Sequence, residues 1–83
     1  MRLDKFLKVS RLIKRRTIAN EACTAGRVLI NDKVAKPSSE VKVGDIITIS
    51  FGNKEVKAEI LDIMATTKKE EAQNLFRYIW LNH

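Results

Sequence analysis

Residues 2–17 and 26–31 read RLDKFLKVSRLIKRRT and GRVLIN, and these two stretches decide the fold of the chain. The apolar residues of the first stretch recur at intervals of three and four, which predicts a short amphipathic helix. The inward-facing positions of this helix are Leu3, Phe6, Leu7, Ser10 and Ile13, with Val9 near the same arc. Its opposite side is basic and carries Lys5, Lys8, Arg11 and Arg15.

A second short helix is expected after the basic connector Lys14-Arg15-Arg16. Thr17 is of a type favoured at helix N-caps, and Gly26 is favoured just beyond a helix C-terminus. Between these two residues the small or apolar side chains return at helical spacing. They are Ile18, Ala22 and Ala25.

Strand-forming residues dominate the middle of the chain. The expected strands are Arg27–Ile30, Val34–Ala35, 46–51 and 54–63, and Gly52-Asn53 is a strong hairpin signal between the last two. Asn31-Asp32 tolerates the left-handed conformation that a tight turn requires. The alternation of apolar and polar residues along 54–63 breaks at Ile60-Leu61, which suggests a β-bulge there.

The last segment is predicted to be a closing helix. Thr67-Lys68-Lys69-Glu70 fits a capping box. Behind it the apolar side chains follow the spacing i, i+3, i+4, i+7. They are Ala72, Leu75, Phe76 and Ile79.

The order of these elements predicts an α+β fold, with two short N-terminal helices on a small, mostly antiparallel sheet and a C-terminal helix. At 83 residues the chain is long enough for one domain, so we expect residues 1–83 to form a single domain. Its core module would cover residues 2 to about 50, and a hairpin and the closing helix would occupy 51–83.

The net positive charge is confined to one end of the chain. The whole chain has 16 Lys and Arg against 10 Asp and Glu, a net charge of +6. Residues 1–16 hold seven of the basic residues and one acid, whereas residues 17–83 hold nine of each sign. Such concentration indicates a polyanionic partner, and a merely solvated basic face is the alternative.

Other classes of function find little support in the sequence. No apolar run approaches the roughly 18 residues of a membrane span, and the charged N-terminus does not resemble a signal peptide, so we expect a cytoplasmic protein. Cys23 is the single cysteine and His83 is far from it, which argues against a disulfide, a metal site or a nucleophile–base pair. We expect no enzyme activity, no cofactor and no metal.

The basic stretch and its neighbours are the candidate RNA-binding residues. Phosphate contacts would come from the basic side chains, with bidentate geometry available to Arg2 and Arg16. Few aromatic residues lie nearby, which favours recognition of RNA shape and backbone over base stacking. The candidate residues are Arg2, Asp4, Lys5, Lys8, Arg11, Lys14, Arg15, Arg16, Thr17, Arg27 and Asn31.

Asp4 has two possible roles. Either it stabilises the positive end of the first helix, or it orients Arg2 or Arg16 through a salt bridge. The aromatic residues Phe6, Phe51 and Phe76 are assigned to the core by their apolar periodicity. Tyr78 and Trp80 either cover the sheet or contact a partner.

Several landmarks in the first half of the chain resemble the S4 RNA-binding module. They are Arg2-Leu3-Asp4-Lys5-Phe6-Leu7, Lys14-Arg15-Arg16-Thr17, Gly26-Arg27-Val28-x-x-Asn31, Lys36-Pro37-Ser38 and Val43-Gly44-Asp45. With residues 54–83, especially 66–72, the whole chain is similar to the stand-alone S4 factors of bacterial ribosome-associated quality control, themselves similar to a fifteen-kilodalton heat-shock family. Asp32 departs from the family, which often has Gly at that turn position.

The resemblance implies specific partners. They are ribosomal RNA (rRNA) of the large ribosomal subunit, a stalled peptidyl-tRNA and a separate factor that tails the nascent chain, with the present chain acting as a monomer. Three alternatives stay open at this point: a protein- or membrane-interaction module that uses the basic amphipathic helix, a general heat-shock-type binder that rescues subunits, and a detached substrate-guiding domain of an RNA-modifying enzyme.

Overall fold

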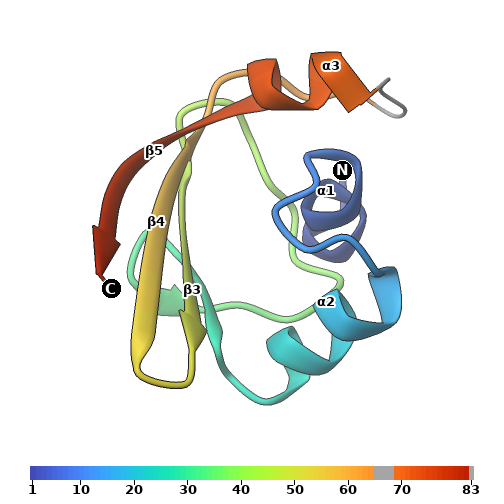
Figure 1. The fold of residues 1–83 in the computed structure, drawn as a ribbon. Coiled ribbons are helices and arrows are strands. Elements are labelled where there is room, and N and C mark those ends of the chain that lie inside the picture. Colours follow the sequence, from blue (N-terminus) through green and yellow to red (C-terminus); the bar gives the residue numbers. More distant parts are fainter. Residues whose placement is uncertain (65–68, 83) are drawn as a thin grey trace.

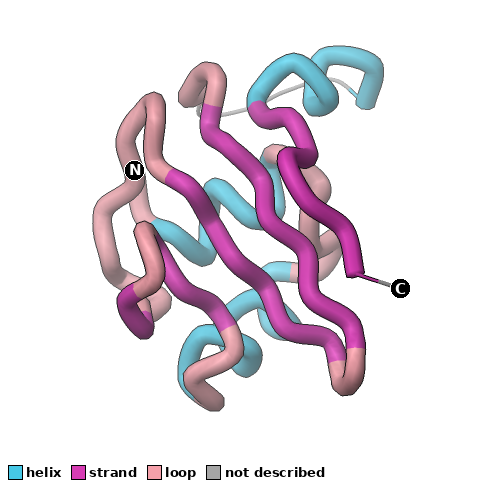
Figure 2. The backbone as a smooth tube through the Cα atoms, turned by 90° about the vertical axis from the view of Figure 1, so that its left-hand side faces the viewer, coloured by secondary structure: helices cyan, strands magenta, loops and turns pink. Residues whose placement is uncertain are grey.

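The computed structural model describes residues 1–64 and 69–82, with the backbone alone at 51, 69, 73 and 80–82. Two helices, α1 (Leu3–Val9) and α2 (Arg16–Thr24), lie on one face of a five-stranded sheet (Figure 1). All neighbouring strands of this sheet are antiparallel, in the order β2-β1-β3-β4-β5 (Figure 2). The α+β class predicted from the sequence is therefore confirmed.

Helix α1 is shorter than its apolar spacing predicts. It ends at Val9, and Arg11 adopts a φ of 61°, which takes the chain out of the helix. Ile13 is nevertheless buried, and its N–H donates to the Leu7 carbonyl at 3.1 Å. The predicted continuation of the helix through Ile13 is wrong, so Arg11 and Arg15 lie on the connector rather than on the helix.

Helix α2 begins one residue before the expected Thr17 cap. Arg15 occupies the N-cap in an extended conformation without a side-chain cap, so the prediction of Thr17 as N-cap is wrong. The C-terminal prediction is confirmed, since Gly26 follows the helix with a φ of 75°. The N–H groups of Gly26 and Arg27 donate to the carbonyls of Cys23 and Ala22, which is the Schellman arrangement.

The first hairpin joins β1 (Val28–Ile30) to β2 (Lys33–Val34) through two left-handed residues, Asn31 at 51° and Asp32 at 68°. These φ values are those of a type I′ turn, whose twist matches that of the strands. The Asn31 amide also accepts from Ile46 N–H at 3.0 Å and donates to Asp45 at 3.1 Å. Asn31 thus ties this hairpin to the start of the next strand.

The second hairpin is formed by β3 (Ile46–Phe51) and β4 (Lys54–Ile60), with the expected turn at Gly52-Asn53. Strand β4 ends at Ile60, three residues earlier than predicted. The register irregularity lies between Lys57 and Ala58, where β4 pairs with β5. The bulge predicted at Ile60-Leu61 is therefore wrong, because the strand simply ends there.

The predicted closing helix is mostly a strand. Helix α3 (Lys69–Ala72) and a 3₁₀ turn η1 (Gln73–Leu75) are followed by β5 (Phe76–Asn82), which pairs with β4. The aromatic and branched residues of β5 suit a strand, and pairing with it satisfies the outer edge of β4. The Thr67-Lys68 part of the capping box lies outside the described residues.

The core lies between the helices and the sheet. Phe6 is fully buried there, as predicted, whereas Phe76 is partly exposed and stacks edge-on against Tyr78 at 5.1 Å between ring centroids. The side chains of Phe51 and Trp80 lie outside the described residues. The central cluster includes Leu3, Phe6, Leu7, Ile13, Ala19, Cys23, Val28, Val41, Ile47, Ile49, Ile60 and Leu75.

We predict that Asp32→Gly raises the free energy of unfolding by about 0.5 kcal/mol, because glycine adopts positive φ without steric cost. The substitution also removes an ion pair between Asp32 and Lys57, whose charged atoms are 3.8 Å apart. The Asp32 side chain is 81% exposed, so this pair contributes little. Urea denaturation followed by circular dichroism measures the change.

The neighbouring residue supplies the matched control. Asn31→Gly also places glycine at a left-handed position, but it deletes the hydrogen bonds to Ile46 and Asp45. We expect this variant to be destabilised by about 1 kcal/mol. Equal stabilisation of both variants would contradict a structural role for the Asn31 amide.

Candidate RNA interface

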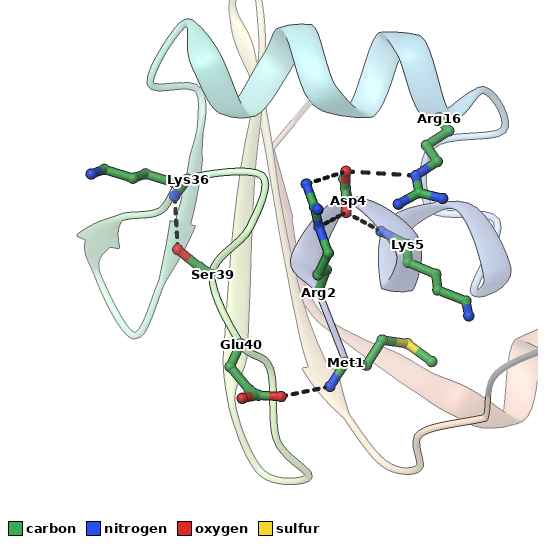
Figure 3. A network of polar contacts seen from close by, with 8 residues as sticks. All are labelled: Met1, Arg2, Asp4, Lys5, Arg16, Lys36, Ser39 and Glu40. Atoms are coloured by element: carbon green, nitrogen blue, oxygen red, sulfur yellow. Dashed lines mark hydrogen bonds and ion pairs between the residues drawn. The ribbon is translucent and has the colours of Figure 1, made fainter.

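A buried carboxylate forms the centre of the site. The Asp4 side chain is 3% exposed, and both of its oxygens face arginine (Figure 3). Arg2 approaches with Nε 3.3 Å from Oδ1 and Nη2 3.3 Å from Oδ2. Arg16 Nε lies 3.6 Å from Oδ2, and the Lys5 backbone N–H donates to Oδ1 at 2.8 Å.

Backbone hydrogen bonds from a distant loop fix the start of α1. The N–H groups of Leu3 and Asp4 donate to the carbonyls of Ser39 at 2.7 Å and Pro37 at 3.1 Å. These N–H groups would otherwise be unpaired at the helix N-terminus. Arg2 also forms a β-bridge with Glu40, so the same loop holds the backbone before and after Arg2.

Both functions considered for Asp4 are present in the structure. The carboxylate lies in the first turn of α1, where negative charge is favourable. It also pairs with both arginines, which come from positions 14 residues apart. The side chains of Arg2 and Arg16 are 54% and 50% exposed, so part of each guanidinium faces solvent. Each has five N–H donors, and those not used by Asp4 remain available to a phosphate.

The other basic residues of the first sixteen have no acidic partner in the described part of the chain. Lys5 is half-buried, and Lys8, Arg11, Lys14 and Arg15 are exposed. Within residues 1–64 and 69–82, the side chains of these five residues form no ion pair or hydrogen bond. The connector and the outer side of α1 therefore present unneutralised positive charge.

The remaining candidate RNA-binding residues, Thr17, Arg27 and Asn31, follow the first sixteen residues in the sequence. Thr17 is exposed in the first turn of α2, beside Arg16. Arg27 is exposed after α2, and its carbonyl accepts from Ser50. The Asn31 amide is engaged by Asp45 and Ile46. No contact in the described part of the chain joins Arg27 or Asn31 to the Asp4 cluster, and their binding of RNA stays a prediction.

Cys23 is buried beneath the site. Burial, together with the negative charge of Asp4, raises the pKa of the Cys23 thiol to about 11. A neutral thiol is a poor nucleophile and metal ligand at neutral pH.

Among the described residues, no three acidic, cysteine or histidine side chains are grouped to hold a metal ion. In the same part of the chain, no helix has the length and apolarity needed to cross a membrane.

Residues 36–40 position Arg2, but none of them is among the RNA-binding residues predicted from the sequence. The Ser39 hydroxyl accepts from the Lys36 N–H at 2.9 Å and closes a turn whose carbonyls bind α1. Glu40 pairs with the N-terminal ammonium at 2.9 Å, and that hydrogen bond lowers the pKa of the Glu40 carboxyl. The motif Lys36-Pro37-Ser38, one of the landmarks of the S4 resemblance, indicates this segment in the sequence.

Comparison with known proteins identifies the family of the chain. Residues 1–47 match the S4 domain. The RQC P-site tRNA stabilizing factor of Bacillus subtilis is 58% identical over 92% of this chain and 88% of its own, and that of Halalkalibacterium halodurans is 57% identical over 92% and 86%. The trimeric heat shock protein 15 of Vibrio cholerae has a TM-score of 0.86 and 37% identity, covering 94% of this chain and 80% of its own. The resemblance predicted from the motifs is confirmed.

We predict that Asp4→Asn weakens RNA binding by about 1–2 kcal/mol, although it makes the chain more positive by one charge. The neutral amide no longer holds the two guanidinium groups in place. The free energy of unfolding should also fall by about 1–3 kcal/mol, since a buried ion pair loses one member. Fluorescence anisotropy with labelled rRNA fragments measures binding, and circular dichroism measures folding.

Glu21→Gln is the control, because it adds the same charge on the exposed surface of α2. We expect this variant to bind RNA slightly more tightly than the unchanged chain. If Asp4→Asn also bound more tightly, the net charge alone would govern binding and the positioning role of Asp4 would be refuted.

Proposed function

Because the chain belongs to the S4 domain family and, within it, to the RQC P-site tRNA stabilizing factors, we propose that it is a non-enzymatic RNA-binding factor of ribosome-associated quality control. It docks on rRNA of a large ribosomal subunit that carries a stalled peptidyl-tRNA. It stabilises that tRNA while a separate factor extends the nascent chain. It acts in the cytoplasm as a single copy.

The observation that carries this proposal is the pair of arginines held by a buried aspartate. Asp4 fixes Arg2 and Arg16 from two different helical termini at distances of 3.3–3.6 Å. Fixed guanidinium groups lose less conformational freedom when they bind phosphate, and they match phosphate geometry in a bidentate way. The other lysines and arginines of residues 1–16, which form no ion pair with the described residues, add a long-range attraction to RNA through counterion release.

Binding alone is sufficient for the proposed activity. A protein that contacts rRNA and prefers one position of the tRNA shifts the tRNA population toward that position. A coupling free energy of about 1–3 kcal/mol changes the occupancy roughly 5–150-fold. No chemical step is required of the chain, in keeping with the names of its relatives.

A general subunit-rescue function is the second candidate, and the likeness to heat shock protein 15 favours it. Both functions use the same basic surface and the same large subunit. They differ in whether the tailing of stalled chains depends on the protein. A membrane-binding function is less well supported, because the seven residues of α1 offer little apolar surface to a bilayer.

We predict that Arg2→Ala and Arg16→Ala each weaken binding to large ribosomal subunits by about 1–3 kcal/mol, the range for hydrogen bonds to charged groups. Co-sedimentation of purified protein with subunits measures the loss. Arg77→Ala is the matched control, because Arg77 also pairs with a carboxylate, Glu59 at 2.8 Å, but on the sheet away from the basic stretch. Arg77→Ala should bind normally.

Unchanged co-sedimentation of both Arg2→Ala and Arg16→Ala would refute the interface. Because each substitution also removes a partner of buried Asp4, circular dichroism must accompany the binding data. Loss of the folded spectrum at the assay temperature would identify the arginines as structural residues instead.

We predict that stalled nascent chains receive shorter tails in cells that lack the protein, because their peptidyl-tRNA is held less firmly. Affinity purification of the tailing factor, followed by analysis of the attached chains, gives the tail lengths. The Arg77→Ala variant should restore normal tails and Arg16→Ala should not. Tails of normal length in the deletion strain would exclude the quality-control role and leave subunit rescue as the function.

A further inference from the structure

A groove of about 500 Å³ opens beside Arg2, between the second half of α2 and the loop that follows β2. The sequence assigns no function to its α2 wall, which is formed by Asn20 and Thr24. Its opposite wall contains Lys36 and Ser38. No acidic residue is among the described residues that line it, so the groove suits an anionic or neutral ligand.

The walls of the groove combine two kinds of chemistry. Asn20, Thr24 and Ser38 supply an amide and two hydroxyl groups, and none of these side chains forms a hydrogen bond within the described part of the chain. Val34 and Pro37 supply apolar surface, and Val34 is 69% exposed. No aromatic residue is among the described residues that line the groove, so these residues offer no platform for stacking a base.

Arg2 and Lys36, the cations among the described residues that line the groove, lie on separate segments. Arg2 is held against Asp4, whereas the Lys36 side chain extends away from that cluster (Figure 3). The turn between Lys36 and Ser39 fixes the loop that carries Lys36. A chain of alternating phosphates and sugars can therefore place phosphates near the two cations and a sugar near the uncharged groups of the same groove.

We propose that this groove binds the sugar–phosphate backbone of one RNA strand and recognises a ribose 2′-hydroxyl through Asn20 and Thr24. The proposal rests on the RNA-binding function proposed above and adds a means of distinguishing RNA from DNA. The 2′-hydroxyl is both a donor and an acceptor, and it is the group by which proteins tell the two nucleic acids apart. Amide and hydroxyl side chains complement both of its capacities.

The test compares an RNA hairpin of about 16 base pairs with the DNA hairpin of the same sequence, the length that small RNA-binding domains can span. Anisotropy at one fixed salt concentration gives both affinities for the full chain. We expect the unchanged protein to prefer RNA by about tenfold or more, as two neutral hydrogen bonds allow. The double variant Asn20→Ala/Thr24→Val should lose most of this preference through weaker RNA binding alone.

Two control variants define the comparison. Asn74→Ala removes another exposed amide, outside the groove, and should leave both affinities unchanged. Lys8→Ala removes an exposed charge and should weaken RNA and DNA binding by the same factor. Ser38→Ala tests the opposite wall and spares the helix, so a misfolded double variant does not end the experiment.

The outcomes separate this inference from the proposed function. Tight RNA binding with no preference over DNA, or equal losses on both hairpins in the Asn20→Ala/Thr24→Val variant, would overturn the groove as a ribose site while RNA binding stands. An unchanged RNA preference in a folded Asn20→Ala/Thr24→Val variant would overturn it as well. Failure of the unchanged protein to bind either hairpin or large subunits would overturn the proposed function itself.

Discussion

The structure depends most on the burial of the Asp4 carboxylate. A buried charge is costly unless it is paired and hydrogen-bonded, so Asp4 requires Arg2, Arg16 and the Lys5 N–H around it. Arg2 precedes α1 and Arg16 begins α2, which means that this one carboxylate fixes how the two helices meet. The same pairing holds the guanidinium groups that we propose bind RNA, so in this proposal folding and binding share one set of contacts.

The sheet provides the second constraint, because it carries the loop that holds α1. The Asn31 amide joins the first hairpin to Asp45 and Ile46, and the chain between them returns to α1. Along this return the carbonyls of Pro37 and Ser39 receive the first N–H groups of α1. The position of Arg2 is therefore set from both sides, by the loop through its backbone and by Asp4 through its side chain.

The sequence predicts the fold class, the end of α2 at Gly26 and the two hairpins, because those features depend on local turn chemistry. It fails for Phe76 to Ile79, where the spacing of apolar residues suits a helix but β4 offers a free edge. It also overextends α1, since Ile13 is buried after the helix has ended and so continues the apolar pattern. From the sequence, an ion pair with an arginine is only one of two roles open to Asp4. Whether Asp4 reaches Arg16 depends on how α1 and α2 pack.

The structure shows how the charges of the first sixteen residues are divided between the surface and the interior. The first sixteen residues carry seven positive charges and one negative charge, and the negative one is buried behind two guanidinium groups. From these sixteen residues an approaching phosphate chain therefore meets only positively charged side chains, and salt in the solvent screens their attraction. In the proposed interface the exposed lysines and arginines other than Arg2 and Arg16 contribute to attraction by number, since none of them pairs with an acidic side chain in the described part of the chain. Arg2 and Arg16 contribute by position, since Asp4 fixes their direction. In the proposed interface, the strength of the attraction to RNA and the orientation of the bound RNA therefore depend on different residues.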